Sequence, residues 1–320
     1  MTAHYTRAVR RWYAEHARDL PWRDATATPW SVLVSEFMLQ QTPVSRVLPA
    51  HRAWLDRWPD PASLAASTAA DAVRQWDRLG YPRRAVRLHA CAQIITAEHG
   101  GQVPATADQL ILLPGIGPYT AAAVASFAYH ERQPVLDTNV RRVLARLVTG
   151  VGLPQPAVTA AEVALARRLL PADGREAAAW SVGVMELGAL VCTAARPRCT
   201  DCPLAPQCAW LANGRPPATE RRGQAAYAGS DRQCRGRILA VLRAADGPVP
   251  ASSLAGTWTD SAQQARALAA LINDGLVTRS AGGAICLPGE AEVTVPEAES
   301  LHPRARECAA GLPAPTAAIR

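Results

Sequence analysis

Apolar residues in the first 210 positions recur with the spacing of amphipathic helices, with polar residues between them. No segment there alternates apolar and polar residues over a useful length, so the pattern predicts helices and no strands. Prolines and glycines separate the helices, which we expect at residues 5–16, 29–39, 44–57, 61–76, 82–99 and 106–112.

The regular pattern ends at the sequence Asn213-Gly214-Arg215-Pro216-Pro217. The polar stretch that begins there continues to about Ser230. Clusters of Gly, Pro and small polar residues between regular segments are typical of loops, so we interpret residues 216–230 as a linker.

A second region of regular pattern covers residues 231–288. It contains an amphipathic helix, a short helix near Ser252, a longer helix, and two short strands that flank Ala281-Gly282-Gly283. Helices followed by a small hairpin predict a winged-helix-like domain. The remaining residues, 289–320, are rich in Ala, Pro and Glu and are predicted to form a disordered tail.

The 320 residues are enough for two or three domains, and they carry a net charge of +7. All 34 basic residues are arginine, and such a surface suits phosphate backbones, although many basic proteins bind no nucleic acid. Charged residues interrupt the N-terminal region, and no segment reaches the roughly 20 apolar residues that span a bilayer. We therefore expect a cytoplasmic protein, whose eight cysteines are not disulfides.

A tight corner, Pro114-Gly115-Ile116-Gly117, separates the apolar pair Leu112-Leu113 from a helix that begins near Pro118. Its two glycines permit a bend that a Cβ would strain, and a proline suits the first turn of a helix. The free amides of the corner and the positive end of the helix would face outward together, which predicts a phosphate-binding site. An ordinary connection between two helices is the alternative.

Asp137 lies just after Pro134 and at or beside the N-cap of the next expected helix. The free N–H groups and the dipole of a helix hold a carboxylate ionised in this position. Most such aspartates are only structural caps. A phosphate-binding corner followed closely by a fixed anion is, however, what the stabilisation of a cationic intermediate on a nucleic acid requires.

Four cysteines follow the spacing C-x6-C-x2-C-x5-C. Thiols grouped so closely in a cytosolic chain predict a metal site, for which zinc is the generic alternative as the bound metal. The remaining cysteines are scattered, and we interpret them as buried or incidental thiols. The expected metal ligands are Cys192, Cys199, Cys202 and Cys208.

Three segments resemble a known family. L-P-G-I-G-P-Y-T-A and V-L-D-T-N-V-R-R-V resemble the helix–hairpin–helix and Gly/Pro…Asp signature of the DNA glycosylase superfamily that includes endonuclease III. S-E-F-M-L-Q-Q-T is similar to the S-E-x-M-L-Q-Q-T segment of its MutY-like adenine glycosylases. The resemblance covers about residues 14–210 and implies an all-α, two-lobed fold. One lobe would be a six-helix module of residues 24–134, and the other would combine residues 1–23 and 135–215.

The resemblance assigns catalytic roles to two carboxyl groups. Glu36 would be the general acid that protonates the flipped adenine and then helps to activate water, and Asp137 would stabilise the oxocarbenium-like sugar. The apolar residues around Glu36 agree with this, because partial burial raises the pKa of a carboxyl group. An isolated glutamate would otherwise be interpreted as a solvated surface residue.

Tyr119 stands where bifunctional relatives of this family carry a nucleophilic lysine. A Schiff base needs an amine, and this chain has no lysine, so we expect a monofunctional hydrolase. As in some MutY-like enzymes, Tyr119 would hydrogen-bond near the sugar. Plain packing at the start of a helix is the alternative for this residue.

The resemblance also implies contacts with double-stranded DNA. Gln41 would fill the gap left by the flipped base, and Tyr81 would be a second wedge beside the opposite base. Basic residues would meet phosphates, although a solvated basic face is the plainer alternative. The expected DNA contacts are Gln40, Gln41, Thr42, Tyr81, Arg83, Arg84, Pro114, Gly115, Gly117, Arg196 and Arg198.

The cysteine spacing is similar to the 4Fe–4S motif of endonuclease III-type enzymes, and E-L-G-A-L-V-C leads into it. The resemblance therefore favours an iron–sulfur cluster with a structural, DNA-positioning role. The two arginines between the first two cysteines, Arg196 and Arg198, would be fixed against phosphate.

One feature of the family is missing. Members that remove adenine opposite 8-oxoguanine normally carry a C-terminal MutT-like domain, and residues 231–288 are too short and too helical for it. We nevertheless expect a monomeric glycosylase acting on adenine mispaired with 8-oxoguanine or guanine. A thymine glycosylase for T/G mismatches and a non-catalytic DNA-binding protein are the alternatives.

Overall fold

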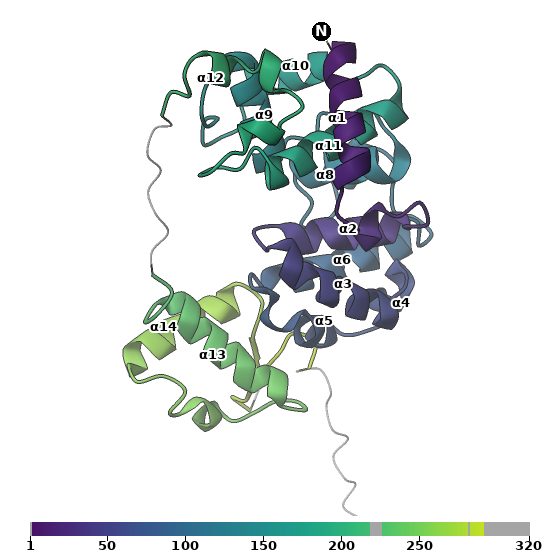
Figure 1. Cartoon of the computed structure of the whole chain (residues 1–320). Coiled ribbons are helices and arrows are strands. Elements are labelled where there is room, and N and C mark those ends of the chain that lie inside the picture. Colours follow the sequence, from purple (N-terminus) through teal and green to yellow (C-terminus); the bar gives the residue numbers. More distant parts are fainter. Residues whose placement is uncertain (1, 218–225, 281, 291–320) are drawn as a thin grey trace, which may run out of the picture.

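The computed structural model describes residues 2–217, 226–280 and 282–290. These residues form two helical lobes and a small third body at the C-terminal end (Figure 1). The predicted all-α, two-lobed fold is confirmed, since the only paired strands in the described residues are two of two residues each. None of the described helices is long and apolar enough to cross a membrane.

The first lobe, here called the helical module, contains seven helices. They are α2 (Pro29–Leu39), α3 (Val44–Arg57), α4 (Pro61–Ala65), α5 (Ala69–Trp76), α6 (Arg83–Glu98), α7 (Ala107–Leu110) and α8 (Pro118–Tyr129). The bounds of α2 and α3 agree with the expected ones. The single helix expected at 61–76 is wrong, because Thr68 starts a new helix there. Its hydroxyl accepts the N–H of Asp71 at 3.0 Å, while the Asp71 carboxylate accepts the N–H of Thr68 at 3.2 Å.

The second lobe, here called the cysteine lobe, combines the N-terminal helix with elements that follow the helical module in the sequence. Its elements are α1 (Thr2–His16), α9 (Thr138–Leu144) with the π-turn Ala145–Thr149, α10 (Ala160–Leu169), α11 (Gly174–Leu190) and α12 (Ala209–Ala212). Helix α1 packs on α11, and Gly183 permits this, because a Cβ there would lie 2.7 Å from the Val9 side chain. Side chains of both helices belong to the buried core of this lobe.

The third part, here called the C-terminal body, follows the expected order of elements. It contains α13 (Asp231–Ala244), a 3-10 turn (Ala251–Leu254), α14 (Ser261–Asn273), β1 (Thr278–Arg279) and β2 (Ile285–Cys286). The strands are antiparallel, with Thr278 opposite Cys286. The winged-helix assignment and the domain boundaries stay predictions. The expected disordered tail lies outside the described residues except for 289 and 290, as does much of the expected linker.

The C-terminal body packs against the helical module. Buried residues of α13 and α14 belong to the same hydrophobic cluster as residues of α5 and α6. Arginines fix the contact at its edge, since Arg74 donates to the Ala245 carbonyl at 2.7 Å and Arg243 donates to the Val73 carbonyl at 3.1 Å. The cysteine lobe has a hydrophobic cluster of its own.

Candidate active site

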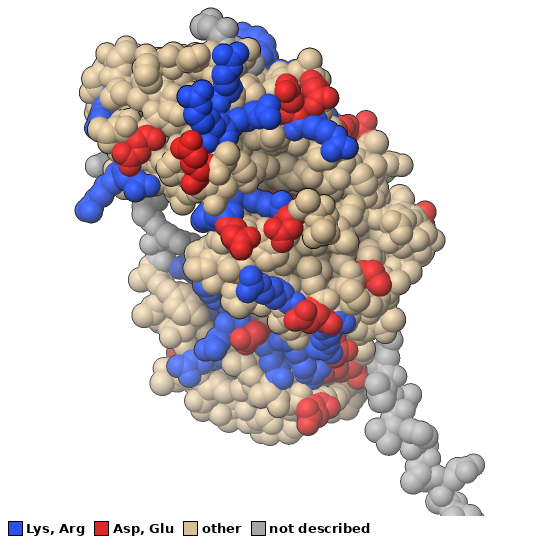
Figure 2. Space-filling view, turned by 45° about the vertical axis from the view of Figure 1, so that its right-hand side comes forward, with Lys and Arg blue, Asp and Glu red and all other residues tan. Residues whose placement is uncertain are grey.

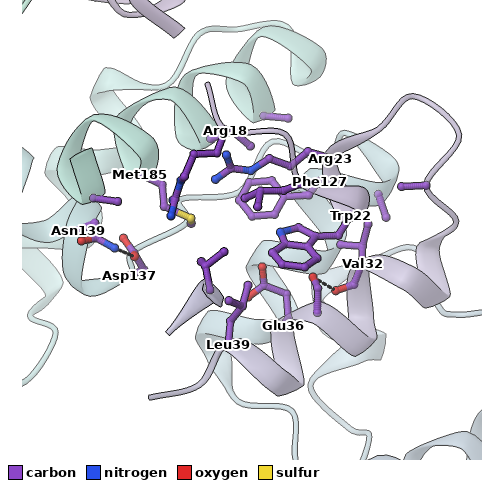
Figure 3. A pocket seen from close by; sticks show the side chains of 18 of the residues that line it. Arg18, Trp22, Arg23, Val32, Glu36, Leu39, Phe127, Asp137, Asn139 and Met185 are labelled. Carbon is purple, nitrogen blue, oxygen red and sulfur yellow. Dashed lines mark hydrogen bonds between the residues drawn. The ribbon is translucent and has the colours of Figure 1, made fainter. Parts of the chain in front are cut away.

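A cleft of about 1170 Å³ lies between the helical module and the cysteine lobe. Its lining comes mainly from the segment before α2, from α2, from both ends of α8, from the start of α9 and from α11. Figure 3 shows Glu36 and Asp137 entering this cavity from different elements, with Trp22, Phe127 and Met185 also pointing into it. The cleft thus combines two carboxyl groups with apolar walls.

Glu36 lies on α2 with only 4% of its surface exposed. Burial raises the pKa of its carboxyl group to about 7, and the negative charge of Asp137 acts in the same direction. A hydrogen bond from Tyr119 and the charge of Arg23 lower this pKa in part. The raised pKa is the direction expected from the apolar neighbours, and it lets the group carry a proton near neutral pH.

Asp137 is the N-cap of α9, as expected. Its carboxylate accepts the N–H of Val140 at 2.6 Å and the side-chain amide of Asn139 at 2.7 Å. The bonds of the cap favour the ionised form of Asp137, as expected, but burial acts in the opposite direction and is the larger effect. Burial raises the pKa of Asp137 above its ordinary value, and the bonds from Val140 and Asn139 offset this only in part.

Tyr119 lies in the first turn of α8, and its hydroxyl forms a hydrogen bond with Glu36. Burial and the two neighbouring carboxylates raise the pKa of Tyr119 well above its usual range. Its hydroxyl therefore keeps its proton and donates to the Glu36 carboxylate. Tyr119 is thus a polar member of the cleft, and the helix–hairpin–helix corner directs it there.

A third buried carboxylate, Glu186, was not anticipated from the sequence. Glu186 of α11 is fully buried, and Arg18 donates to it at 2.7 Å while Arg23 lies 3.0 Å away. Burial would raise the pKa of Glu186, but the Arg18 bonds and the Arg23 charge lower it overall. These contacts join the segment that precedes α2 to the cysteine lobe. They could not be predicted from the sequence because the partners lie far apart along the chain.

The helix–hairpin–helix corner has the expected geometry at Gly115, whereas Gly117 has an ordinary φ of −102° and space for a Cβ, contrary to expectation. Gly115 has a φ of +81°, a left-handed conformation that favours glycine, and Gly117 caps α8 directly before Pro118. A Cβ at Gly115 would also lie 2.8 Å from Arg87 and 2.9 Å from the Phe37 ring. The corner is therefore packed against α6 and against α2, the helix that carries Glu36 into the cleft.

The expected DNA contacts differ in exposure: some are exposed or partly buried, and others are buried in the protein. Gln41 and Tyr81 are exposed, and both have positive φ values, of 54° and 48°. Gln40 is partly buried, and its amide approaches the Thr120 hydroxyl at 3.5 Å. Arg83 lies 3.2 Å from Asp274 of the C-terminal body.

Two of the expected contacts need a correction. Arg84 and Thr42 are both buried, and they hydrogen-bond each other at 2.9 Å. The guanidinium of Arg84 also donates to main-chain carbonyls, so its donors are directed into the protein rather than toward a phosphate. Figure 2 shows other arginines distributed over this face of the molecule, with acidic side chains among them.

The four expected metal ligands line one small pocket together with Arg146 and Trp210. All four are free thiols, and Arg146 donates to the Cys192 sulfur at 3.3 Å while its guanidinium lies 4.5 Å from the Trp210 ring centre. In the described residues, no group of three or more His, Cys, Asp or Glu is arranged to hold a metal ion. The donor chemistry of four thiols backed by a cation nevertheless fits a cluster of iron and sulfide.

The loop between the first two cysteines carries the two arginines expected to meet phosphate. Arg196 and Arg198 are both exposed. Arg198 donates to the Leu190 carbonyl at 2.9 Å and lies 3.6 Å from Asp201, so it helps to fold the loop.

The cysteine loop and the cleft are joined by hydrogen bonds. Asn139, which donates to Asp137, accepts a bond from Arg142 at 2.8 Å. The same guanidinium donates to the Cys192 carbonyl at 2.7 Å. One buried arginine therefore connects the loop of the first cysteine with the Asp137 cap.

Comparison with known proteins agrees with this geometry. Residues 34–166, which include Glu36, Tyr119 and Asp137, match the family described as HhH-GPD superfamily base excision DNA repair protein. The adenine DNA glycosylase of Mycobacterium tuberculosis (strain CDC 1551 / Oshkosh) is 53% identical over 285 residues, which cover 87% of this chain and 92% of the relative. That of Mycolicibacterium smegmatis is 50% identical over 286 residues, which cover 89% and 96%.

A solved structure of a thermostable thymine-DNA glycosylase has a similar fold. It superposes with a TM-score of 0.59 and 24% identity, and the match covers 66% of this chain and 97% of that chain. At this level of identity, the similarity supports a shared fold and no further conclusion.

Proposed function

The chain belongs to the HhH-GPD superfamily of base excision DNA repair proteins, as a MutY-like DNA glycosylase, and from this premise we propose that its substrate is mispaired adenine. The enzyme would hydrolyse the N-glycosidic bond of adenine opposite 8-oxoguanine or guanine in double-stranded DNA. The observation that carries the proposal is the pair of carboxyl groups, Glu36 and Asp137, in one cleft with Tyr119.

Glu36 supplies the proton in this proposal. With a pKa of about 7, a large fraction of Glu36 is protonated at neutral pH and can protonate the leaving adenine. The bond between C1′ and the base nitrogen breaks, and its electron pair stays with the protonated base. Water then adds to C1′, and the Glu36 carboxylate takes up the proton that the water loses.

Asp137 stabilises the charge that develops on the sugar, and Tyr119 positions Glu36. The Asp137 carboxylate is fixed by the bonds from Val140 and Asn139, so it need not reorganise when the sugar becomes cationic. That positive charge also favours the ionised form of Asp137, against the effect of burial. Tyr119 donates to Glu36 and thereby holds its carboxyl group in place.

The absence of lysine sets the reaction type. Cleavage of the strand through a Schiff base needs an amine, and the sequence contains no lysine side chain. The proposed enzyme therefore leaves an intact strand with an abasic site. The hydrolytic route through Glu36 needs only water.

In this proposal, residues that the structure describes recognise the mispaired duplex. In this chain, we assign the duplex contacts to Gln41, Tyr81 and the corner at Gly115, and further phosphate contacts to Arg83, Arg196 and Arg198.

The cofactor belongs to the same proposal. Cys192, Cys199, Cys202 and Cys208 would hold a 4Fe–4S cluster, which when bound would cross-link the loop that carries Arg196 and Arg198. That loop is then rigid enough to bind phosphate. The chain would act as a monomer on DNA of the bacterial nucleoid.

A single-turnover glycosylase assay tests the substrate. Duplexes carry adenine opposite 8-oxoguanine, guanine or cytosine, and thymine opposite guanine, and strand breaks are measured with and without alkali. We expect adenine release that appears as strand breaks only after alkali, and its loss in Glu36→Gln.

Other outcomes of the assay would overturn the proposal. Thymine release without adenine release would assign the chain to the T/G mismatch enzymes. Binding of every duplex with no release, equal in parent and Glu36→Gln, would indicate a DNA-binding protein without catalysis. Strand breaks without alkali would contradict the monofunctional reaction.

A further inference from the structure

Two loops, each with one exposed side chain at its tip, have unusual backbone geometry. The first is Gln40–Thr42, at the end of α2, and the second is Gly80–Tyr81, just before α6. Gln41 and Tyr81 adopt left-handed backbone conformations that residues with a side chain seldom adopt. Such conformations persist only where the surrounding structure enforces them, and they concentrate at functional sites.

Arg84 supplies the enforcing contacts on the first loop. It lies in the first turn of α6 and is 5% exposed. Its Nη1 shares two N–H groups among three carbonyls, those of Phe37 at 2.7 Å, Met38 at 2.8 Å and Gln40 at 2.7 Å. These are carbonyls from the C-terminal end of α2, which have no partner within the helix.

The same guanidinium holds the second loop. Its Nη2 donates to the Gly80 carbonyl at 2.9 Å, and its Nε donates to the Tyr81 carbonyl at 3.4 Å. Nη2 also donates to the Thr42 hydroxyl at 2.9 Å, and that hydroxyl donates in turn to the Leu79 carbonyl at 3.2 Å. Arg84 and Thr42 therefore form two parallel bridges between the loops.

An arginine is required for this arrangement. Its rigid fork offers five N–H donors in one plane, whereas lysine offers three on one flexible atom. The Arg84 guanidinium also lies 5.0 Å from the Trp76 ring and 5.6 Å from the Tyr81 ring, so it contacts the side chain of the exposed wedge as well as its backbone. Burial lowers the pKa of Arg84 only to about 10, so it stays charged at neutral pH.

We propose that Arg84 is a positioning residue that locks the Gln40–Thr42 and Gly80–Tyr81 loops into one rigid wedge, which extrudes the target base. The proposal rests on the glycosylase function above. A wedge works only if its parts enter the duplex together, because unstacked and unpaired bases must be stabilised on both strands at once. Arg84 touches neither DNA nor the reacting atoms, and acts through Gln41 and Tyr81.

The test compares two duplexes. In one, adenine is paired opposite guanine. In the other, it faces an abasic-site analogue, so that flipping costs little. For Arg84→Lys we expect single-turnover adenine release to fall at least about tenfold on the paired duplex but less than about threefold opposite the abasic analogue. Thr42→Val removes only the hydroxyl bridge and should show the same selective loss to a smaller degree.

A matched control separates positioning from simple loss of structure. Arg141 is another buried arginine, which donates to the carbonyls of Gln155 and Ala157 and pairs with Glu162, far from both loops in the sequence. Arg141→Lys should reduce release from both duplexes by the same factor. The active fraction of each variant is titrated first, so that unfolded protein does not enter the comparison.

A second measurement does not need catalysis. The fluorescence of 2-aminopurine in place of the target adenine rises when the base leaves the stack, and we expect Arg84→Lys to abolish this rise while duplex affinity changes little. Equal losses on both duplexes, or an unchanged fluorescence rise, would show that Arg84 is only a structural residue. A parent protein that flips the base but releases no adenine would contradict the proposed function and leave the wedge intact.

Discussion

Glu36 is a single residue whose environment decides its chemistry. Its carboxyl group is buried beside another carboxylate, whereas a hydrogen bond from Tyr119 and the charge of Arg23 favour its ionised form. Burial raises the pKa of Glu36 toward neutral pH, and for the same reason ionisation of Glu36 destabilises the folded protein. Activity and stability are therefore linked through one proton.

The pH dependence of adenine release should report this proton. Because Glu36 must be protonated to act as the acid, the single-turnover rate constant should fall above about pH 7, by up to about tenfold per pH unit. The raised pKa of Asp137 predicts a second loss on the acid side, where its carboxylate becomes protonated. A rate that stays constant from about pH 6 to pH 9 would rule out this role of Glu36.

Stability should change with pH in the opposite sense to that of a salt-bridged carboxylate. The folded pKa of Glu36 is raised from 4.5 to about 7, so its contribution is present below pH 4.5 and is lost as the pH rises through 7. Glu36→Gln cannot ionise. Its free energy of unfolding relative to the parent should therefore increase by up to about 3 kcal/mol between about pH 5 and pH 8, measured by urea denaturation. Glu98→Gln, at an exposed position, is the control and should show no such change.

The helix–hairpin–helix element shows how a short corner organises the cleft. Helices α7 and α8 meet at Gly115, and α8 then carries Tyr119 toward Glu36. The corner needs glycine at position 115 because of the positive φ there and because of close packing. At Gly117, a Cβ would meet nothing within 4 Å.

Alanine substitutions should distinguish the two glycines. Gly115→Ala combines a positive φ with overlap against Arg87 and Phe37, so we expect it to lower the free energy of unfolding by about 1–3 kcal/mol. Gly117→Ala has an ordinary φ of −102° and free space, and it should cost less than about 0.5 kcal/mol. Equal effects in denaturant titrations would show that the packing at Gly115 is not decisive.

At the scale of the whole molecule, each hydrophobic cluster combines residues that are far apart in the sequence. The N-terminal helix α1 completes the core of the cysteine lobe, and α13 and α14 extend the core of the helical module. The C-terminal body is therefore coupled to the lobe that carries Glu36. Unfolding of the C-terminal body should therefore lower the stability of the lobe that forms part of the cleft.

A core substitution far from the cleft tests this coupling. Leu242 of α13 is 1% exposed, and Leu242→Ala should cost about 2–5 kcal/mol. We expect adenine-release activity to be lost on heating at a temperature roughly 5–10 °C lower than in the parent. Val158→Ala, at a half-exposed position, is the control. An unchanged inactivation temperature for Leu242→Ala would show that the C-terminal body unfolds independently.

The sequence alone determined the features that depend on neighbours along the chain. The helical period, the proline and glycine breaks, and the cap at Asp137 are local, which is why the bounds of α2 and α3 agree with the structure. The capping box at Thr68 was also local, but the apolar spacing on both sides of it concealed the break. The carboxylates, Tyr119 and the cysteines could be selected because their motifs are local as well.

Only the tertiary structure decided how these pieces act on one another. Arg84 stands in a basic stretch that favours phosphate contacts, yet the fold brings carbonyls from α2 around it and buries its charge. The pKa of Asp137 rises because burial outweighs the helix cap, and the Glu186 contacts join residues more than 160 positions apart. Desolvation and long-range contacts depend on what surrounds a group in space, and no local pattern of residues contains that information.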